Sequence, residues 1–358
     1  MPQLSMSRTT IGMMILLIVG ISYCFFNYSA SRYTKAKKQV KAYYVSKNSH
    51  ELVTEPVEWI VKVVYSDNPI SRLLLPVSGY FGKHVTQYAH KVAHATDPIV
   101  VNTKIGRFQR LYKEMLDMHE YAVPDQGFKT FNDWFIRRFK DLEASRPMEP
   151  DVHAIVSPAD SKLLIIPNLS QDLRIVIKEQ RFNVAKFLGD VALAKQFDDG
   201  VMMIFRLAPY DYHRYHYPFD CFVGPEQCIN GGYHSVNPRA FTAGAKPLTT
   251  NKRSYEVLTP VGTMHTGCTV AMVQVGATVV ASIINEFMDY TTGRLKDAHT
   301  LYKKGQEMGY FQFGGSTIVL LFPKGAIVPD AQIVAHSQNG YETAVKVRET
   351  VATWAVQS

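Results

Sequence analysis

The run Gly314-Gly315-Ser316-Thr317 holds the residue types best suited to chemistry on the chain itself. Gly315 has no side chain to shield its carbonyl, and the next residue carries a hydroxyl. In a turn strained in the right direction, Ser316 could attack that carbonyl in an N-to-O acyl shift. Gly-Gly-Ser-Thr is also a common composition of ordinary turns, so the motif gains its meaning from the residues that accompany it.

Candidate acids and bases precede this serine. Asp160 ends a short apolar segment, and the stretch 207–218 holds Asp211, His213 and His216. A histidine that takes the hydroxyl proton, oriented by a carboxylate, would activate the serine, in the chain order Asp, His, Ser. The Gly-x-Ser-x-Gly context of many serine hydrolases is absent from the sequence. The two histidines with Asp211 could instead bind a metal, but no third and fourth ligand stands at a suitable spacing.

The elements that must position these residues are short strands joined by turns. The apolar run 318–322 lies between glycine and proline and predicts a buried strand with Ser316 at its mouth. The run 201–205 predicts another strand. Farther upstream, Thr130 and Asp133 have the spacing of a helix N-cap and capping box. One apolar face of that helix would hold Phe131, Trp134, Phe135 and Phe139.

These patterns predict an α+β fold, with a mostly β catalytic domain and helices at its N-terminal edge. The expected divisions are a transmembrane anchor with a basic juxtamembrane segment at 1–50, a helical membrane-associated region at 51–150, and the catalytic domain at 151–358. The C-terminal stretch 331–354 would complete the sheet, with Gly340 in a hairpin turn.

The N-terminal segment has the features of a membrane anchor. Residues 9–31 carry no charged side chain and are strongly apolar at their centre. About 20 residues span a bilayer core, so the stretch is just long enough for a single pass. Six basic residues follow it before the first acid, Glu51, and this bias favours a catalytic domain on the cytoplasmic side. A cleaved signal peptide and an organellar inner membrane are the alternatives.

The composition is that of a globular chain with a membrane-facing charge. Hydrophobic residues make up 46% and charged residues 20%, and the net charge is +8. The basic excess is concentrated near the N-terminus and no RNP or zinc-finger pattern occurs, which favours an anionic membrane over nucleic acid. The four cysteines are irregularly spaced, and indicate reduced thiols rather than a disulfide framework or a C-x-x-C metal site.

Seven motifs, taken together and in order, resemble the phosphatidylserine decarboxylase family over about residues 70–325. They are 130–135, 157–160, 207–216, 235–237, 275–280, 304–309 and 313–317. Each motif alone is weak, and the set is specific. The resemblance implies an enzyme that decarboxylates phosphatidylserine to phosphatidylethanolamine, with the two fragments of its own chain as partners. It also implies a homodimer.

The same resemblance implies that the enzyme makes its own prosthetic group. Ser316 would attack Gly315, the chain would split between them, and Ser316 would become a covalently bound pyruvoyl group derived from pyruvate. By the family pattern, Asp160 and His216 would drive this cleavage and His213 would act in decarboxylation. A ketone of this kind can capture the substrate amine and accept the electrons that CO₂ leaves behind, so neither a metal nor an added coenzyme is implied.

Two positions depart from the family pattern. Ser161 follows Asp160 where glycine is usual, and Lys252 stands where many members have glutamate. The second change could alter the wall of the site or the substrate preference. Two further hypotheses are a serine hydrolase with a conventional triad and a membrane-bound binding protein without a pyruvoyl group. The intact mass separates all three, because only the decarboxylase predicts two fragments.

Overall fold

The computed structural model describes residues 43–46, 51–55, 89–170, 182–262, 268–277, 283–292, 294–297, 299–313 and 316–356. The segment 9–31, in which an anchor is predicted, lies outside the described residues. Among the described helices, none is long and apolar enough to cross a bilayer. The anchor, its side of the membrane and the divisions after residues 50 and 150 therefore stay predictions.

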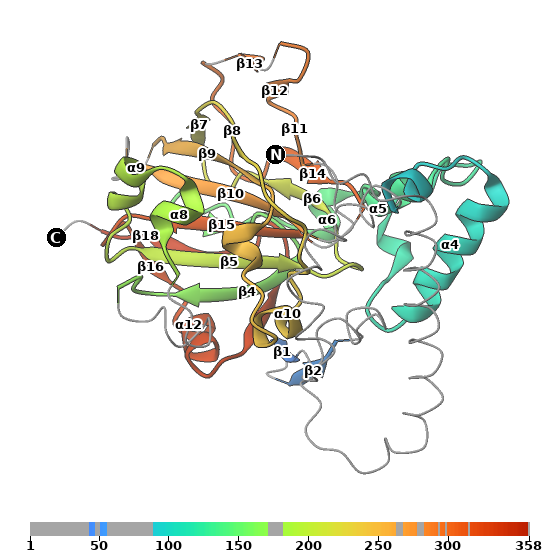
Figure 1. Ribbon diagram of the computed structural model, residues 1–358, viewed down its shortest axis with the longest axis horizontal. Coiled ribbons are helices and arrows are strands. Elements are labelled where there is room, and N and C mark those ends of the chain that lie inside the picture. Colours follow the sequence, from blue (N-terminus) through green and yellow to red (C-terminus); the bar gives the residue numbers. More distant parts are fainter. Residues whose placement is uncertain are drawn as a thin grey trace, which may run out of the picture. The chain divides into compact units, whose positions relative to one another are not determined.

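One large sheet organises the fold (Figure 1). Its strands are β1 (Tyr43–Ser46), β2 (Leu52–Thr54), β4 (Ser161–Ile166), β5 (Val201–Leu207), β7 (Cys221–Val223), β8 (Gln227–Ile229), β9 (Arg253–Pro260), β10 (Val270–Gly276), β15 (Ser316–Phe322) and β17 (Glu342–Val345). They run in the order β2-β1-β17-β4-β5-β15-β10-β9-β7, with β8 also paired to β9. The β1–β17 pair is parallel and the other pairs are antiparallel.

Smaller sheets and short helices surround this sheet. The further strands are β3 (Ala154–Val156), β6 (Arg214–His216), β11 (Ile283–Asn285), β12 (Met288–Asp289), β13 (Arg294–Leu295), β14 (Glu307–Phe311), β16 (Ile327–Pro329) and β18 (Thr350–Trp354). They form the sheets β11-β14-β6, β16-β18-β3 and β12-β13. The helices are α4 (Pro98–Leu111), α5 (Phe131–Phe135), α6 (Leu142–Ser145), α8 (Val184–Leu188), α9 (Val191–Lys195), α10 (Pro238–Thr242), α11 (Pro247–Thr250) and α12 (Ala331–Gln338), with a 3₁₀ turn at Met118–Glu120. The predicted mostly β, α+β fold is confirmed.

Strand β15 lies in the middle of the large sheet, as its apolar run predicts. All seven of its residues are buried, and it pairs with β5 on one side and β10 on the other. Successive side chains point to opposite faces of a strand. Ile318 and Leu320 therefore join one apolar core, whereas Val319 and Leu321 join the other. Because both faces are covered, the strand needs no polar side chain after its first two residues.

Short helices close the two faces of the sheet (Figure 1). Phe187 and Leu188 of α8 pack in the same core as Val319, whereas Ile333 of α12 belongs to the core of Ile318. A third apolar cluster joins α4 and α5 to the residues after β5, through Phe108, Trp134 and Tyr210 among others. This cluster attaches the helical region to the end of β5, where β15 begins.

The predicted capping box of α5 is confirmed. The Thr130 side-chain oxygen accepts a hydrogen bond from the N–H of Asp133 at 3.0 Å, and the Asp133 carboxylate accepts one from the N–H of Thr130 at 3.1 Å. The helix ends at Phe135. Phe139 is buried as predicted, but it lies in the segment after the helix and stacks on Tyr121 with ring centroids 4.8 Å apart.

Two sequence expectations are wrong. Leu52–Thr54 form strand β2 rather than helix, because they pair with β1, and the buried Glu55 that follows binds Arg206 at 2.7 Å. Gly340 does not turn a hairpin. Gly340 lies just after helix α12 and its C-cap Asn339, and its φ is +80°. A glycine with positive φ commonly ends a helix at this position. The strand after it, β17, joins the large sheet as predicted.

Candidate active site

Ser316 is the first residue of β15, at the mouth of the strand as predicted. It pairs with Leu207 of β5 and Gly276 of β10, and it is fully buried. No described residue offers its Oγ a hydrogen-bond partner. An unpaired buried hydroxyl is costly, by about 1–3 kcal/mol, so such an atom in a native fold calls for an explanation. Gly314 and Gly315 lie outside the described residues.

His213 is held between α5 and the strand pair β6–β14. Its Nδ1 lies 2.9 Å from the backbone oxygen of Asp211, and its ring lies on Phe135 with centroids 3.9 Å apart. A carbonyl can only accept, so Nδ1 carries the proton and Nε2 is in the acceptor form. The backbone oxygen of His213 accepts a hydrogen bond from Phe311 at 2.9 Å. The ring is thus fixed in orientation and in tautomer.

His216 is the last residue of β6 and is oriented in the same way. Its Nδ1 lies 2.9 Å from the backbone oxygen of Gly305, and its Nε2 lies 3.4 Å from the Tyr212 hydroxyl. Burial lowers the pKa of His216 to about 4, so the ring is neutral near pH 7. A neutral imidazole with a protonated Nδ1 can act as a base through Nε2.

The backbone conformation at Gly305, whose carbonyl accepts the hydrogen bond from His216, requires a glycine. Its φ is +74°, a conformation that favours glycine, and a Cβ atom there would lie 2.5 Å from the sulfur of Met148. Its oxygen also accepts hydrogen bonds from Nε and Nη2 of Arg348 at 3.2 and 3.1 Å. The C-terminal region therefore helps to hold the carbonyl that orients His216.

Asp160 is a buried carboxylate with its own cationic partners. Arg146 donates to it at 2.7 Å from Nη2 and 3.0 Å from Nε, and the N–H of Val347 donates at 2.8 Å. Burial alone would raise the pKa of Asp160, but the Lys346 ammonium and the Arg146 guanidinium bring it below its ordinary value. The group is thus a carboxylate at neutral pH.

The four predicted site residues do not form a conventional triad. The hydrogen bonds of Asp160 go to Arg146 and Val347, and the group on His216 Nδ1 is a backbone carbonyl. In a Ser-His-Asp triad a carboxylate would occupy that position. The conventional-triad hypothesis needs a hydrogen bond between Asp160 and His216 Nδ1. In this structure the Gly305 carbonyl takes the place of that carboxylate.

The metal alternative finds no support in the side chains. The carboxylate oxygens of Asp211 bind Lys162 Nζ at 2.7 and 2.8 Å, so this carboxylate already has a cationic partner. Within the described parts of the chain, no group of three His, Cys, Asp or Glu side chains is placed to hold a metal ion.

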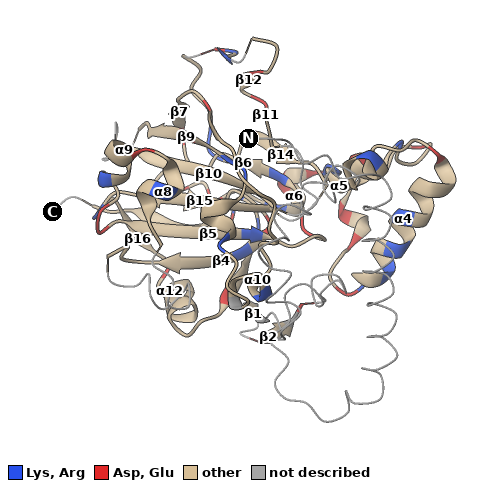
Figure 2. Cartoon of the chain, in the orientation of Figure 1, with Lys and Arg blue, Asp and Glu red and all other residues tan. Residues whose placement is uncertain are grey.

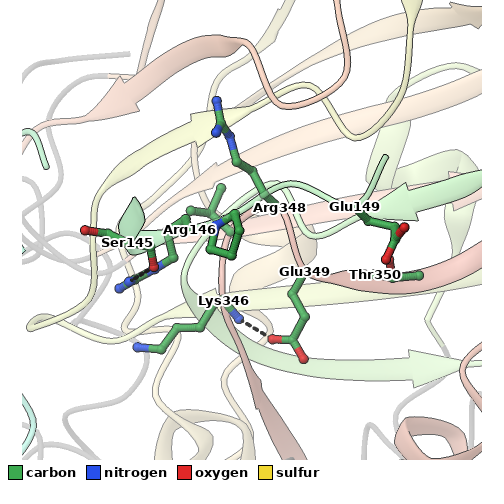
Figure 3. A pocket seen from close by; sticks show the side chains of 9 residues that line it. Ser145, Arg146, Glu149, Lys346, Arg348, Glu349 and Thr350 are labelled. Atoms are coloured by element: carbon green, nitrogen blue, oxygen red, sulfur yellow. Dashed lines mark hydrogen bonds between the residues drawn. The ribbon is translucent and has the colours of Figure 1, made fainter. Parts of the chain in front are cut away.

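A pocket of about 400 Å³ lies against the Asp160 cluster (Figure 3). It is formed by two segments far apart in the sequence, 145–149 and 346–350. Figure 3 shows the side chains of Arg146 and Lys346 beside each other, and both bind Asp160. None of the four predicted site residues lines this pocket.

Sequence reasoning missed the residues that hold the site from outside. The Asn132 side chain binds the N–H of Phe313 at 3.1 Å, ahead of the glycine pair. The Asn251 amide donates to the oxygens of His234 and Gly276 at 2.7 and 2.8 Å, and so fixes the residue opposite Ser316. Asn132 lies in the motif 130–135, and Asn251 precedes Lys252, which departs from the family pattern, so the comparison with the family was the available signal.

Comparison with known proteins gives one consistent match. A family model described as phosphatidylserine decarboxylase matches residues 131–353. A phosphatidylserine decarboxylase proenzyme of Fusobacterium nucleatum is 34% identical over 319 residues, which cover 86% of this chain and 96% of that protein. Proteins of the same name from Chlamydia pneumoniae and Clostridium novyi are each 36% identical, over 67% and 65% of this chain and 74% of their own length.

Proposed function

This chain belongs to the phosphatidylserine decarboxylase family, and we propose that it decarboxylates phosphatidylserine after cutting itself between Gly315 and Ser316. The observation that carries the proposal is the buried hydroxyl of Ser316, for which no described residue is a hydrogen-bond partner, directly after a glycine pair at the mouth of β15. A hydroxyl kept unpaired at that cost is available to react with the carbonyl beside it.

The self-cleavage uses one water and releases one ammonia. The Ser316 oxygen bonds to the Gly315 carbonyl carbon, the C–N bond breaks, and the hydroxyl proton passes to the released nitrogen through a base. Removal of the Ser316 α-proton then expels the Gly315 carboxylate and leaves dehydroalanine at the new end. Water replaces the nitrogen, ammonia departs, and a pyruvoyl group caps residue 317 onward. No oxidant or reductant is needed.

The properties of the two histidines and of Asp160 support this division of labour. His216 is neutral near pH 7 with Nε2 as acceptor, which suits a base that moves the hydroxyl proton. Asp160 is the nearby buried carboxylate, and its negative charge favours a proton arriving on His216. His213 has the same tautomer, so its Nε2 carries no proton; we assign this nitrogen to taking up a proton from the substrate amine or from water and delivering it to the substrate carbon after CO₂ has left.

A pyruvoyl group fits the position of Ser316. The group is no larger than the serine it replaces and carries no charge, so it suits a fully buried site beside Gly276, which has no side chain. When formed, it would supply an electron-accepting carbonyl to the substrate amine. The chain contributes the ends of strands β5 and β10, which pair with Ser316 and hold the group in the sheet.

The test combines intact mass with a lipid assay. Full-length protein in detergent is mixed with vesicles containing phosphatidylserine, and released CO₂ and phosphatidylethanolamine are measured. The proposal expects two fragments, with the smaller one resistant to N-terminal sequencing and modified by borohydride or hydroxylamine. A protein that stays whole, or that splits without decarboxylating the lipid, would contradict it.

We also propose that the enzyme works at a membrane through its N-terminal part. Helix α4 presents Ile99 and Val100 to solvent at 78% and 43% exposure, and Lys104, Arg107 and Arg110 lie along it (Figure 2). Such a helix suits an anionic lipid surface. Sedimentation with the vesicles of the same assay tests this, and the catalytic side of the membrane and the homodimer stay expectations.

We predict that the two fragments stay together after cleavage. Strand β15 would begin the smaller fragment, yet it lies between β5 and β10 of the larger one. Ile318–Phe322 are fully buried, at about 1.5–3 kcal/mol for each apolar side chain, so the association is worth on the order of 10 kcal/mol. The fragments should elute together in mild detergent and separate only in denaturant. Separation at neutral pH without denaturant would contradict this.

We predict that self-cleavage is insensitive to pH down to about pH 5. The pKa of His216 is about 4, so the ring remains an unprotonated base above that value, whereas an ordinary histidine would begin to lose this role near pH 6.5. Below about pH 4 the rate should fall tenfold per pH unit. Radiolabelled chain, made by a short pulse of cell-free synthesis, is transferred to buffers between pH 3 and 8 and followed on gels.

The low pKa of His216 also makes the folded chain less stable at low pH, so the cleavage experiment needs a control for unfolding. The folded pKa of His216 lies below the unfolded value, so the unfolded chain binds more protons below pH 6.5 and stability falls as the pH drops. Circular dichroism must therefore show a folded chain at each pH. A midpoint of the cleavage rate near pH 6.5 in folded protein would rule out His216 as the base described.

A further inference from the structure

Helix α5 contacts the chain just ahead of the predicted cleavage point. Asn132, its second residue, is 4% exposed, and its Oδ1 accepts a hydrogen bond from the N–H of Phe313 at 3.1 Å. Phe313 follows the end of β14 by two residues and precedes the two glycines that lead to Ser316. One side-chain contact from a distant helix therefore fixes the backbone on the upstream side of the cleavage point.

Phe313 is held by rings as well as by the hydrogen bond. Its ring meets Phe131 edge-on at 4.8 Å and 83°, and Phe135 edge-on at 5.2 Å and 88°. Phe135 also lies against His213 at 3.9 Å. The same short helix thus contacts both the residue ahead of the glycine pair and one of the predicted catalytic histidines.

The helix itself is a firm support. Phe131, Trp134 and Phe135 are almost completely buried, so packing in the aromatic cluster holds the helix in place. A side chain on such an element is held more closely than one on a loop. Because the aromatic cluster fixes the helix, the hydrogen bond to Asn132 fixes the backbone of Phe313 relative to that cluster.

We propose that Asn132 is a positioning residue for self-cleavage, and this inference rests on the proposed function. Attack within a chain is fast only when the two atoms are held about 3–3.5 Å apart in the right orientation. Pairing with β5 and β10 fixes the Ser316 end of the turn, and Asn132 fixes the Phe313 end. With both ends fixed, the two glycines between them have fewer conformations to sample before the Gly315 carbonyl meets the Ser316 hydroxyl.

The test compares three substitutions in the full-length chain. Asn132→Ala removes the acceptor and should slow self-cleavage by about 10–100-fold, the scale expected when a reacting group is displaced by about 1 Å. Asn132→Asp keeps an acceptor oxygen at the same place and should restore most of the rate. Asn132→Ser, whose shorter side chain cannot reach Phe313, provides a second slow variant should the alanine variant fail to fold. Rates are followed by gel after pulsed cell-free synthesis.

A matched control separates positioning from simple loss of stability. Asp133→Ala breaks the capping box in the same helix without touching Phe313, so it should lower the melting temperature but leave the cleavage rate close to that of the wild type. After long incubation, the cleaved Asn132→Ala enzyme should show the wild-type kcat per cleaved chain. A purely structural role would lower the rates of both steps.

Several results would overturn the inference. Asn132→Ala cleaving at the wild-type rate, Asn132→Asp cleaving as slowly as Asn132→Ala, or Asp133→Ala slowing cleavage equally would each do so. A wild-type chain that stays whole would remove the proposed function and this inference with it. A wild-type chain that splits no faster than the Asn132→Ala chain would remove the inference alone.

Discussion

Replacing Ser316 with alanine should leave one whole chain of 40.4 kDa that cannot decarboxylate phosphatidylserine. The substitution removes the oxygen that attacks Gly315, so neither the second fragment nor the pyruvoyl group can form. We expect activity to fall on the order of 10⁶-fold, the scale seen when a covalent catalytic group is lost. Intact mass and the vesicle assay measure the two effects separately.

The alanine chain should fold at least as well as the wild type. Ser316 Oγ has no hydrogen-bond partner among the described residues, so its removal relieves a buried polar group rather than breaking a contact. Ser161→Ala is the matched control, because it removes a buried hydroxyl that donates only to Ala159, and it should still split. Two fragments from Ser316→Ala would mean that another residue is the nucleophile, and the assignment would fail.

The elements around Ser316 could be predicted from local patterns. An unbroken apolar run between glycine and proline identified β15, and the spacing of Thr130 and Asp133 identified the start of α5. Both patterns span only a few residues, and each one determines the local backbone conformation directly. The prediction of a hairpin turn at Gly340 was wrong because a glycine with positive φ occurs both in hairpins and at helix ends. The helix that precedes it, α12, decides between the two.

The orientation of the site could not be predicted in this way. His216 takes its tautomer from the Gly305 carbonyl, and Asp160 takes its charge state from Arg146 and the segment at 346–347. These partners are brought together by the sheets, over separations that no local pattern covers. The sequence therefore suggested an Asp-His-Ser arrangement, whereas the structure gives the carboxylate and the histidine separate supports.

The Asp160 supports also explain why the C-terminal region matters to the site. Val347 donates its N–H to Asp160, and Arg348 holds the carbonyl that orients His216. Both residues lie beyond the predicted cleavage point. If the fragments stay associated as we predict, the smaller one supplies both the reacting end and part of the frame around the two titratable groups.

Replacing His213 with alanine should separate the two reactions of this protein. His216 and Ser316 are untouched, so the chain should still split, but kcat for decarboxylation should fall about 10²–10⁴-fold with the loss of a general acid. The ring removed lies on Phe135, so the variant also leaves a cavity that lowers stability. His213→Asn, whose amide can still donate to the Asp211 oxygen, keeps that contact and tests the same loss with less disturbance.

The reciprocal variant makes the assignment of the two histidines falsifiable. His216→Asn can keep the hydrogen bond to Gly305 but has no basic nitrogen, so it should fold and remain uncut. Intact mass then gives opposite results for two rings that lie three residues apart and share one tautomer. An uncut His213→Asn chain, or a cut His216→Asn chain, would show that the proton transfers are divided differently. In that case, the low pKa of His216 would be a consequence of its burial and not a sign that it acts as the base.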